Sequence, residues 1–491
     1  MTKFQRWLIL FIVSSALFVI VVDVTVLYTA LPKLTHELHA TVSEKLWILN
    51  AYTLLMAGLL FGAGTLGDRV GHKKLLSIGL IIFGFASLVA AFSSSATVLI
   101  VARVLLAIGA SMMMPSTLSI IRLAFSEEKE RVFAIGVWAA IAAGGAALGP
   151  LIGGILLEHF WWGSVFFINI PIVIVALILT HIYIPSFAVN SEDTWDFVGS
   201  LLIMIGLIGV VYALKEFGIR GGNLQHALLA LTIGVIFIYL FVKRQEKTTS
   251  PLIDFSLFRN INFSTGVTSA TLLQFSLVGV QFILTQRLQL VLGYTPFQAG
   301  LYLFTMAMAS FFGSIFANKV IMRLGALKTE TISFGISASG LLAYIVLQQI
   351  SLLVDMLCLG LFGIGIGVGM AAASSAIMNN VVKEKAGMAA SIEEVSYEFG
   401  SILGVAIVGS AISFIYSNSF IMPESLSISN QVLDSLDDAI LIAEKLPLLE
   451  AKEVMTRASN AFDKAFTIMF YAFPMLLFVT TLVFNRLLKR Q

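Results

Sequence analysis

Long apolar runs recur from one end of this sequence to the other, and they constrain its fold more than any other feature. Each covers about 18 to 25 residues, enough for a helix to cross a hydrocarbon core about 30 Å thick. Of the 491 residues, 58% are hydrophobic and only 12% are charged, whereas a soluble protein carries about 25% charged residues. The runs lack the alternation of polar and apolar residues found in membrane β-strands. The sequence therefore predicts an all-α polytopic membrane protein in contact with the lipid bilayer.

We expect fourteen transmembrane helices. They lie near residues 7–31, 46–66, 75–93, 97–120, 131–156, 164–184, 197–216, 224–242, 263–288, 297–319, 329–348, 352–379, 386–416 and 462–486. The first run is too long for a signal peptide and lacks a small-residue cleavage site, so we interpret it as the first membrane helix.

The basic residues indicate the orientation. An even number of spans puts both termini on one side, and the segments assigned to the inside carry about twice as many Lys and Arg residues as those outside. The acidic inner loop at 187–197 is the exception. We therefore predict a multi-pass plasma-membrane protein with both termini in the cytoplasm. The longest non-membrane stretch, 417–461, is then extracellular, and we interpret it as a solvated hairpin with a helical second part rather than a substrate-gathering element.

Two short segments resemble each other and indicate an internal repeat. They read LGDRVGHKK (66–74) and VIMRLGALK (320–328), so that Arg69 matches Arg323 and Gly71 matches Gly325. This spacing predicts two six-helix bundles, at 1–190 and 251–491, with a two-helix insert at 191–250. Parallel repeats of this kind are typical of transporters whose substrate site lies at the midplane between the halves.

Five ionisable residues are predicted to lie well inside spans: Asp23, Arg103, Glu393, Glu394 and Glu398. A charge at the bilayer centre costs roughly 2.5–3.5 kcal/mol on insertion scales, so each of these groups must face a wet cavity, pair with an opposite charge or lose its charge. Arg103 stays cationic and is expected to pair with a carboxylate, for which Asp23 is a candidate, or with backbone carbonyls. Asp23 itself is interpreted as a protonation site, with a packing role as the alternative.

The glutamates of the thirteenth predicted span form a cluster. Glu394 and Glu398 are four residues apart and share one helical face, whereas Glu393 can pair with Tyr397. Two carboxylates on one face can exchange protons and, when ionised, attract an organic cation. The alternative for Glu393 is a simple hydrogen bond to a neighbouring helix. Aromatic residues such as Trp138 and Tyr397 could add cation–π contacts.

The sequence offers little support for an enzyme. Its six histidines are scattered, its single cysteine (Cys358) lies in mid-helix, and it has no phosphate-binding loop. We therefore expect no cofactor and no metal, and we expect no nucleic-acid partner.

Four motifs resemble those of the major facilitator superfamily. GTLGDRVGHKK (64–74) is similar to the signature between the second and third helices, and GGAALGPLIGG (144–154) is similar to the antiporter motif of the fifth helix. The fourth-helix motif is matched by 99–111, with Arg103 and Gly109 in place. VDVTVLYTALP (22–32) resembles the first-helix motif of the fourteen-helix drug:proton antiporters, and together with the acidic stretch near residue 393 it makes the chain most similar to Qac-type exporters of quaternary ammonium compounds.

The resemblance implies a proton-coupled multidrug efflux antiporter that confers resistance by exporting lipophilic cations, working as a monomer. Proton coupling would involve the acids Asp23, Glu394 and Glu398, with Arg103 as a fixed positive charge beside them. Substrate would be bound by Glu393, Glu394, Glu398, Tyr397 and Trp138. Gating would involve Asp68, Arg69, Gly71, Gly149 and Pro150. Ser310 stands where dication-exporting relatives carry an acid, so export of divalent organic cations is not implied. A nutrient:proton symporter of the same fold is the main alternative, and a channel or receptor is less well supported.

Overall fold

The computed structural model describes residues 2–186, 196–218, 223–248, 251–348, 350–381, 386–422 and 429–489. Within these ranges, a few side chains are not described; they belong to residues 61, 64, 65, 68, 128, 129, 132, 139, 218, 386 and 387. The described residues are helical or irregular and include no strand.

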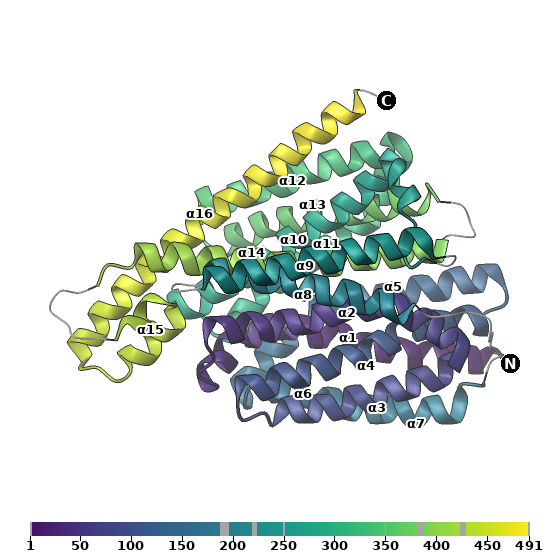
Figure 1. Ribbon diagram of the computed structural model, residues 1–491, viewed down its shortest axis with the longest axis horizontal. Helices are drawn as coiled ribbons and strands as arrows, with labels where there is room; N and C mark the ends of the chain where they lie inside the picture. The colour runs from purple at the N-terminus through teal and green to yellow at the C-terminus, as the bar shows by residue number, and fades with distance from the viewer. Residues whose placement is uncertain are drawn as a thin grey trace.

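The N-terminal group of helices fills the lower part of Figure 1. It consists of α1 (Lys3–Glu37), α2 (Val42–Val70), α3 (His72–Ala91), α4 (Ala96–Ala124), α5 (Glu128–His159), α6 (Ser164–Phe167) and α7 (Asn169–Tyr183). Two further helices, α8 (Phe197–Gly218) and α9 (Leu224–Lys247), pack against each other.

The C-terminal group fills the upper part of the same view, apart from α15, which lies at the lower left. It consists of η1 (Phe255–Arg259), α10 (Ile261–Gln286), η2 (Arg287–Val291), α11 (Pro296–Leu324), α12 (Ala326–Leu347), α13 (Leu352–Met378), α14 (Ala386–Ser419), η4 (Asn430–Leu433), α15 (Leu436–Ala443) and α16 (Leu448–Leu488).

Thirteen helical segments of the described chain are long and apolar enough to cross a membrane. The remaining expected span, 46–66, coincides with α2, a helix of 29 residues. The sixth span consists of α6 and α7, which follow each other with only Ile168 between them. The prediction of an all-α membrane protein is therefore confirmed, and each of the fourteen expected spans coincides with a described helix or pair of helices.

The largest difference from the predicted spans concerns the last one. It was expected to begin at residue 462, but α16 begins at Leu448 and runs for 41 residues. Hydropathy detects only the apolar part of this helix, because residues 448–461 carry several charges. The described part of the stretch 417–461, which was expected to be extracellular with a helical second part, contains the end of α14, η4, α15 and the first turns of α16.

The two groups of helices repeat the same packing. In the first group α1 packs against α5, α2 against α4 and α3 against α4; in the second, α10 packs against α14, α11 against α13 and α12 against α13. The groups meet along two seams, α5 with α11 and α2 with α14, and α8 packs against both helices of the second seam.

The domain boundaries predicted near residues 190 and 250 lie outside the described residues and stay predictions.

The repeated turns explain the sequence echo between 66–74 and 320–328. Gly71 ends α2 with φ +96°, and Gly325 ends α11 with φ +80°. Side chains at either position would meet no atom within 4 Å, so the backbone conformation and not the available space favours glycine there.

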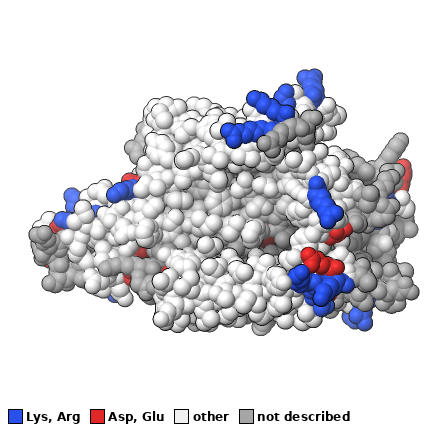
Figure 2. Space-filling model, turned by 45° about the horizontal axis from the view of Figure 1, so that its top comes forward, with Lys and Arg blue, Asp and Glu red and all other residues white. Residues whose placement is uncertain are grey.

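Charged side chains gather toward the two ends of the molecule, and a broad uncharged band lies between them (Figure 2). The two chain termini lie at one end, and α15 lies at the other (Figure 1). We refer to these as the terminal end and the α15 end.

Candidate cation- and proton-binding site

Asp23 and Arg103 form a buried ion pair between α1 and α4. Arg103 Nη1 donates to Asp23 Oδ2 at 2.6 Å, and Arg103 Nε donates to Ile48 O at 3.2 Å. Asn169 Nδ2 donates to the other carboxylate oxygen at 2.9 Å. The guanidinium lies 4.4 Å from the ring centroid of Tyr52. Both oxygens of Asp23 are therefore bonded, and the two charged side chains are no more than 2% exposed.

The pair matches the partner that the sequence suggested for Arg103, but the sequence reasoning missed Asn169 and Tyr52. A signal for Asn169 was present, because it interrupts the apolar start of the sixth span. Charges buried as deeply as these are stable only when their remaining donors and acceptors are bonded. The amide and the ring complete such an environment here.

The acidic residues of α14 lie in a different environment. Glu393, Glu394, Tyr397 and Glu398 remain partly exposed, although α14 packs against α2, α8, α10 and α16. Tyr397 Oη donates to Glu393 Oε1 at 2.9 Å, as their spacing suggested. The Ser374 hydroxyl of α13 also bonds Glu393.

Glu394 and Glu398 have no hydrogen bond or ion pair to any described residue. Glu398 is within electrostatic reach of Arg103 and of the rings of Tyr28 and Tyr52, which belong to α1 and α2. The acidic face of α14 is therefore directed toward the first group of helices. A partly exposed carboxylate inside a helix bundle can exchange protons with water or bind a cation.

Trp138 lies apart from this cluster. Its Nε1 donates to Thr117 Oγ1 at 3.1 Å, which joins α5 to α4. No described contact joins Trp138 to the acidic residues of α14. Its predicted contact with a bound cation stays a prediction.

The predicted gating residues occupy two places. Gly71 forms the turn between α2 and α3, and Arg69 is exposed beside it; the side chain of Asp68 is outside the described residues. Gly149 packs against the Thr25 side chain of α1 so closely that a Cβ would clash with the Thr25 hydroxyl.

Pro150 lies where α5 meets the second group of helices. A Cβ on Gly300 of α11 would lie 2.5 Å from the Pro150 carbonyl oxygen. The GGAALGPLIGG motif therefore brings α5 against α1 through Gly149 and against α11 through Pro150.

One buried acid was missed. Glu330, near the start of α12, is 0% exposed and accepts a 3.1 Å hydrogen bond from Ser269 of α10. Its Oε1 has no hydrogen-bond partner in the described part of the chain. Sequence reasoning passed over it because it falls at the very edge of the predicted eleventh span.

The sequence model described as Major Facilitator Superfamily matches residues 13–193 and again 194–420. The chain therefore belongs to this superfamily, as its motifs indicated. It is a multi-pass membrane transporter and not an enzyme.

Its relatives include several resistance proteins. Methyl viologen resistance protein SmvA of Salmonella typhimurium is 38% identical over 94% of this chain and 93% of its own length. Multidrug efflux pump LfrA of Mycolicibacterium smegmatis is 32% identical over 94% of this chain and 92% of its own length.

A solved structure shares the fold at low sequence identity. A bacterial homologue of the human lysosomal transporter Spinster, in an inward-facing and unoccupied conformation, superposes with a TM-score of 0.69 at 15% identity, covering 99% of this chain and 98% of its own.

Proposed function

We propose that this protein exports lipophilic organic cations, such as quaternary ammonium compounds, dyes and cationic drugs, in exchange for protons. The observation that carries the proposal is the state of Glu394 and Glu398. They lie one helical turn apart, are partly exposed, and have no bonding partner among the described residues. Resistance and efflux names among the relatives support export as the direction of transport.

The two carboxylates supply the attraction for the cation. At 4 Å a pair of unit charges attracts by about 1 kcal/mol in water and about 4 kcal/mol at the effective dielectric constant near a protein surface. Apolar helix surfaces bury the remainder of the ligand, and Tyr397 offers its ring face for a cation–π contact. Protonation of the carboxylates removes this attraction, so that a proton and the cation compete for the same site.

The Asp23–Arg103 pair couples to this site through Glu398. While Asp23 is ionised, it neutralises Arg103 at 2.6 Å. A proton on Asp23 would leave the Arg103 charge uncompensated, and Glu398 is the acid of α14 within its electrostatic reach. Arg103 would then compete with the bound cation for Glu398, which links proton uptake at Asp23 to release of the cation.

The relatives also bear on the charge of the substrate. Ser310 stands where an acid would support export of divalent cations, yet SmvA is named for methyl viologen, a dication. Glu394 and Glu398 could bind both charges of such a ligand, because residues i and i+4 of a helix are separated by about 6 Å along its axis. Monovalent and divalent cations should therefore both be tested.

We propose further that the chain acts in the plasma membrane, with both termini in the cytoplasm, as a monomer and without a cofactor. The terminal end would then face the cytoplasm and the α15 end the outside.

Purified protein in liposomes tests the proposal. Addition of a lipophilic cation should drive proton movement in the opposite direction, and Glu394→Gln, Glu398→Gln and Asp23→Asn should each reduce it. Glu453→Gln, at the α15 end of α16, is the control, because its carboxylate pairs with Arg457 of the same helix. Unchanged coupled transport in all three variants would contradict the proposal.

A further inference from the structure

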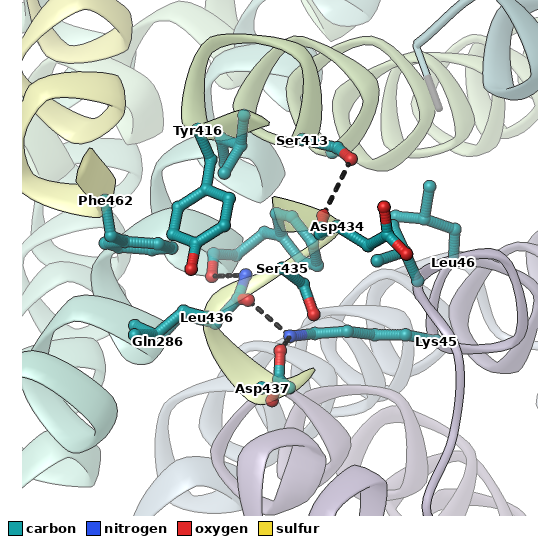
Figure 3. A pocket seen from close by; sticks show the side chains of 14 residues that line it. Lys45, Leu46, Gln286, Ser413, Tyr416, Asp434, Ser435, Leu436, Asp437 and Phe462 are labelled. Carbon is teal, nitrogen blue, oxygen red and sulfur yellow. Dashed lines mark hydrogen bonds and ion pairs between the residues drawn. The ribbon is translucent and has the colours of Figure 1, made fainter. Parts of the chain in front are cut away.

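A buried ion pair crosses the seam between the two groups of helices at the α15 end. Lys45, in the first turn of α2, lies 2.6 Å from Asp437 Oδ2 in α15, and their side chains are 6% and 10% exposed. The Lys45 ammonium also donates to Gln286 Oε1 at the end of α10. Figure 3 shows the extended Lys45 side chain, whose terminal nitrogen reaches both acceptors.

Other polar contacts cross the seam at the same end. Thr35 of α1 donates to Asp437 Oδ1 at 3.5 Å, and Gln289 Nε2 donates to Thr29 O at 3.0 Å. At the rim, His36 of α1 lies 3.0 Å from Glu444, which follows α15. These contacts join α1 and α2 to α10, η2 and α15.

The segment that carries Asp437 is itself fixed to the second group. Tyr416 Oη of α14 donates to Val432 O, and Ser413 Oγ of the same helix donates to Asp434 O. The cavity that remains beside Lys45 has a volume of about 30 Å³, room for one or two waters. The ion pair is therefore almost dry, and the segment that leads into α15 is hydrogen-bonded to α14.

We propose that Lys45, Asp437 and Gln286 form a latch that holds the α15 end of the transporter closed. Alternating access requires the two groups of helices to separate at this end, and separation must pull the ammonium away from both acceptors. Breaking a buried pair leaves charges that need a partner or water. The latch therefore stabilises the conformation seen here. In this proposal η4 and α15 connect the two groups of helices at this end of the molecule.

This inference does not depend on which solute is moved, only on alternating access, so it can be tested without substrate or proton gradient. Thr29 provides the reporter position, because it is 0% exposed and lies where Gln289 crosses the seam. In a Cys358→Ser background, Thr29→Cys should react slowly with a membrane-impermeant maleimide added from the α15 side. Opening at this end would expose it.

Lys45→Met and Asp437→Asn should each raise the labelling rate by roughly tenfold or more, because a population shift toward the open state follows directly from loss of the pair. The charge swap Lys45→Asp with Asp437→Lys should return the rate toward the starting value, which general loosening of the fold would not do. Arg457→Met is the matched control, since Arg457 pairs with Glu453 within α16 and does not cross the seam.

Two results would overturn the latch. One is that Lys45→Met and Asp437→Asn label at the same rate as the native protein, although both variants label completely once they are denatured. The other is fast labelling that the charge swap leaves unchanged. Either result leaves the proposed cation:proton exchange intact, because that exchange is measured by transport.

Discussion

Asp23 and the pair Glu394–Glu398 are acids at membrane depth in two contrasting environments. Asp23 is completely buried, and both of its oxygens are bonded, to Arg103 and Asn169. Glu394 and Glu398 are partly exposed and unbonded within the described chain. The difference teaches that an acid in a membrane helix is not by itself a substrate site. Its partners decide whether its charge is already matched or is available to a guest.

Loss of the Asp23 charge is predicted to have the largest effect. Asp23→Asn keeps the size of the side chain but leaves Arg103 buried without its counter-ion, which should destabilise the protein by about 3–5 kcal/mol. Thermal unfolding of the purified protein in detergent measures this loss. The double variant Asp23→Asn with Arg103→Gln should recover part of the lost stability. An Asp23→Asn variant as stable as the native protein would show that Arg103 does not need this counter-ion.

The packing of the same region gives the next prediction. Gly149→Ala places a methyl group against the Thr25 hydroxyl, two residues beyond Asp23, and overpacking of this kind costs about 1–3 kcal/mol. Gly144→Ala in the same helix is the matched control, since a Cβ there meets no atom within 4 Å. It should be neutral or slightly stabilising, because alanine favours helix by up to about 1 kcal/mol over glycine. Equal melting temperatures for the two variants would contradict close packing at Gly149.

The unbonded acids should behave in the opposite way. Glu398→Gln is expected to leave thermal stability near that of the native protein, because Glu398 makes no hydrogen bond or ion pair within the described chain. Its affinity for a lipophilic cation should fall by about tenfold, a loss of about 1.4 kcal/mol. Glu393→Gln should cost less affinity, since Glu393 already accepts a hydrogen bond from Tyr397. Calorimetric or fluorescence titration of the purified variants distinguishes the two positions, and a larger loss at Glu393 would reverse the assignment.

Asp196 supplies a bonded acid just outside the membrane-spanning segments, where the smallest effect is expected. Although burial opposes its charge, hydrogen bonds from the Gly199 N–H, Arg244 and Gln245 hold the pKa of Asp196 below its ordinary value. Its contribution to stability is therefore present above that ordinary value, about 4, and is lost as the pH falls through the lower folded value. Native protein should lose more of its melting temperature on acidification than Asp196→Asn does. A pH dependence that is identical in the two proteins would contradict this account.

The helices and the partner of Arg103 were largely predictable from the sequence. Hydropathy identifies membrane helices directly, because the bilayer requires about 20 apolar residues for each. The Asp23–Arg103 pairing could be expected, because a permanent cation at membrane depth needs an opposite charge. The extension of α16 back to Leu448 could not be found by hydropathy, since that part of the helix lies beyond the apolar run.

The Lys45–Asp437 pair was beyond sequence reasoning for a different reason. The two residues are 392 positions apart. Lys45 stands beside an expected membrane boundary and Asp437 in the middle of the expected extracellular stretch, and a charge is ordinary at both places. They become buried where α15 meets the ends of α1, α2 and α10, at Thr35, Lys45 and Gln286. Glu330 shows the same limit, because its burial depends on α10 and α12 meeting at Ser269.

A cation and protons are proposed to compete for Glu394 and Glu398, and cation affinity measured as a function of pH tests this competition most directly. In the native protein the affinity for a permanently charged ligand should rise with pH, and each binding event should release protons into a weakly buffered solution. In Glu394→Gln with Glu398→Gln, both effects should shrink together. A native affinity that does not change with pH, with no proton released on binding, would contradict the account.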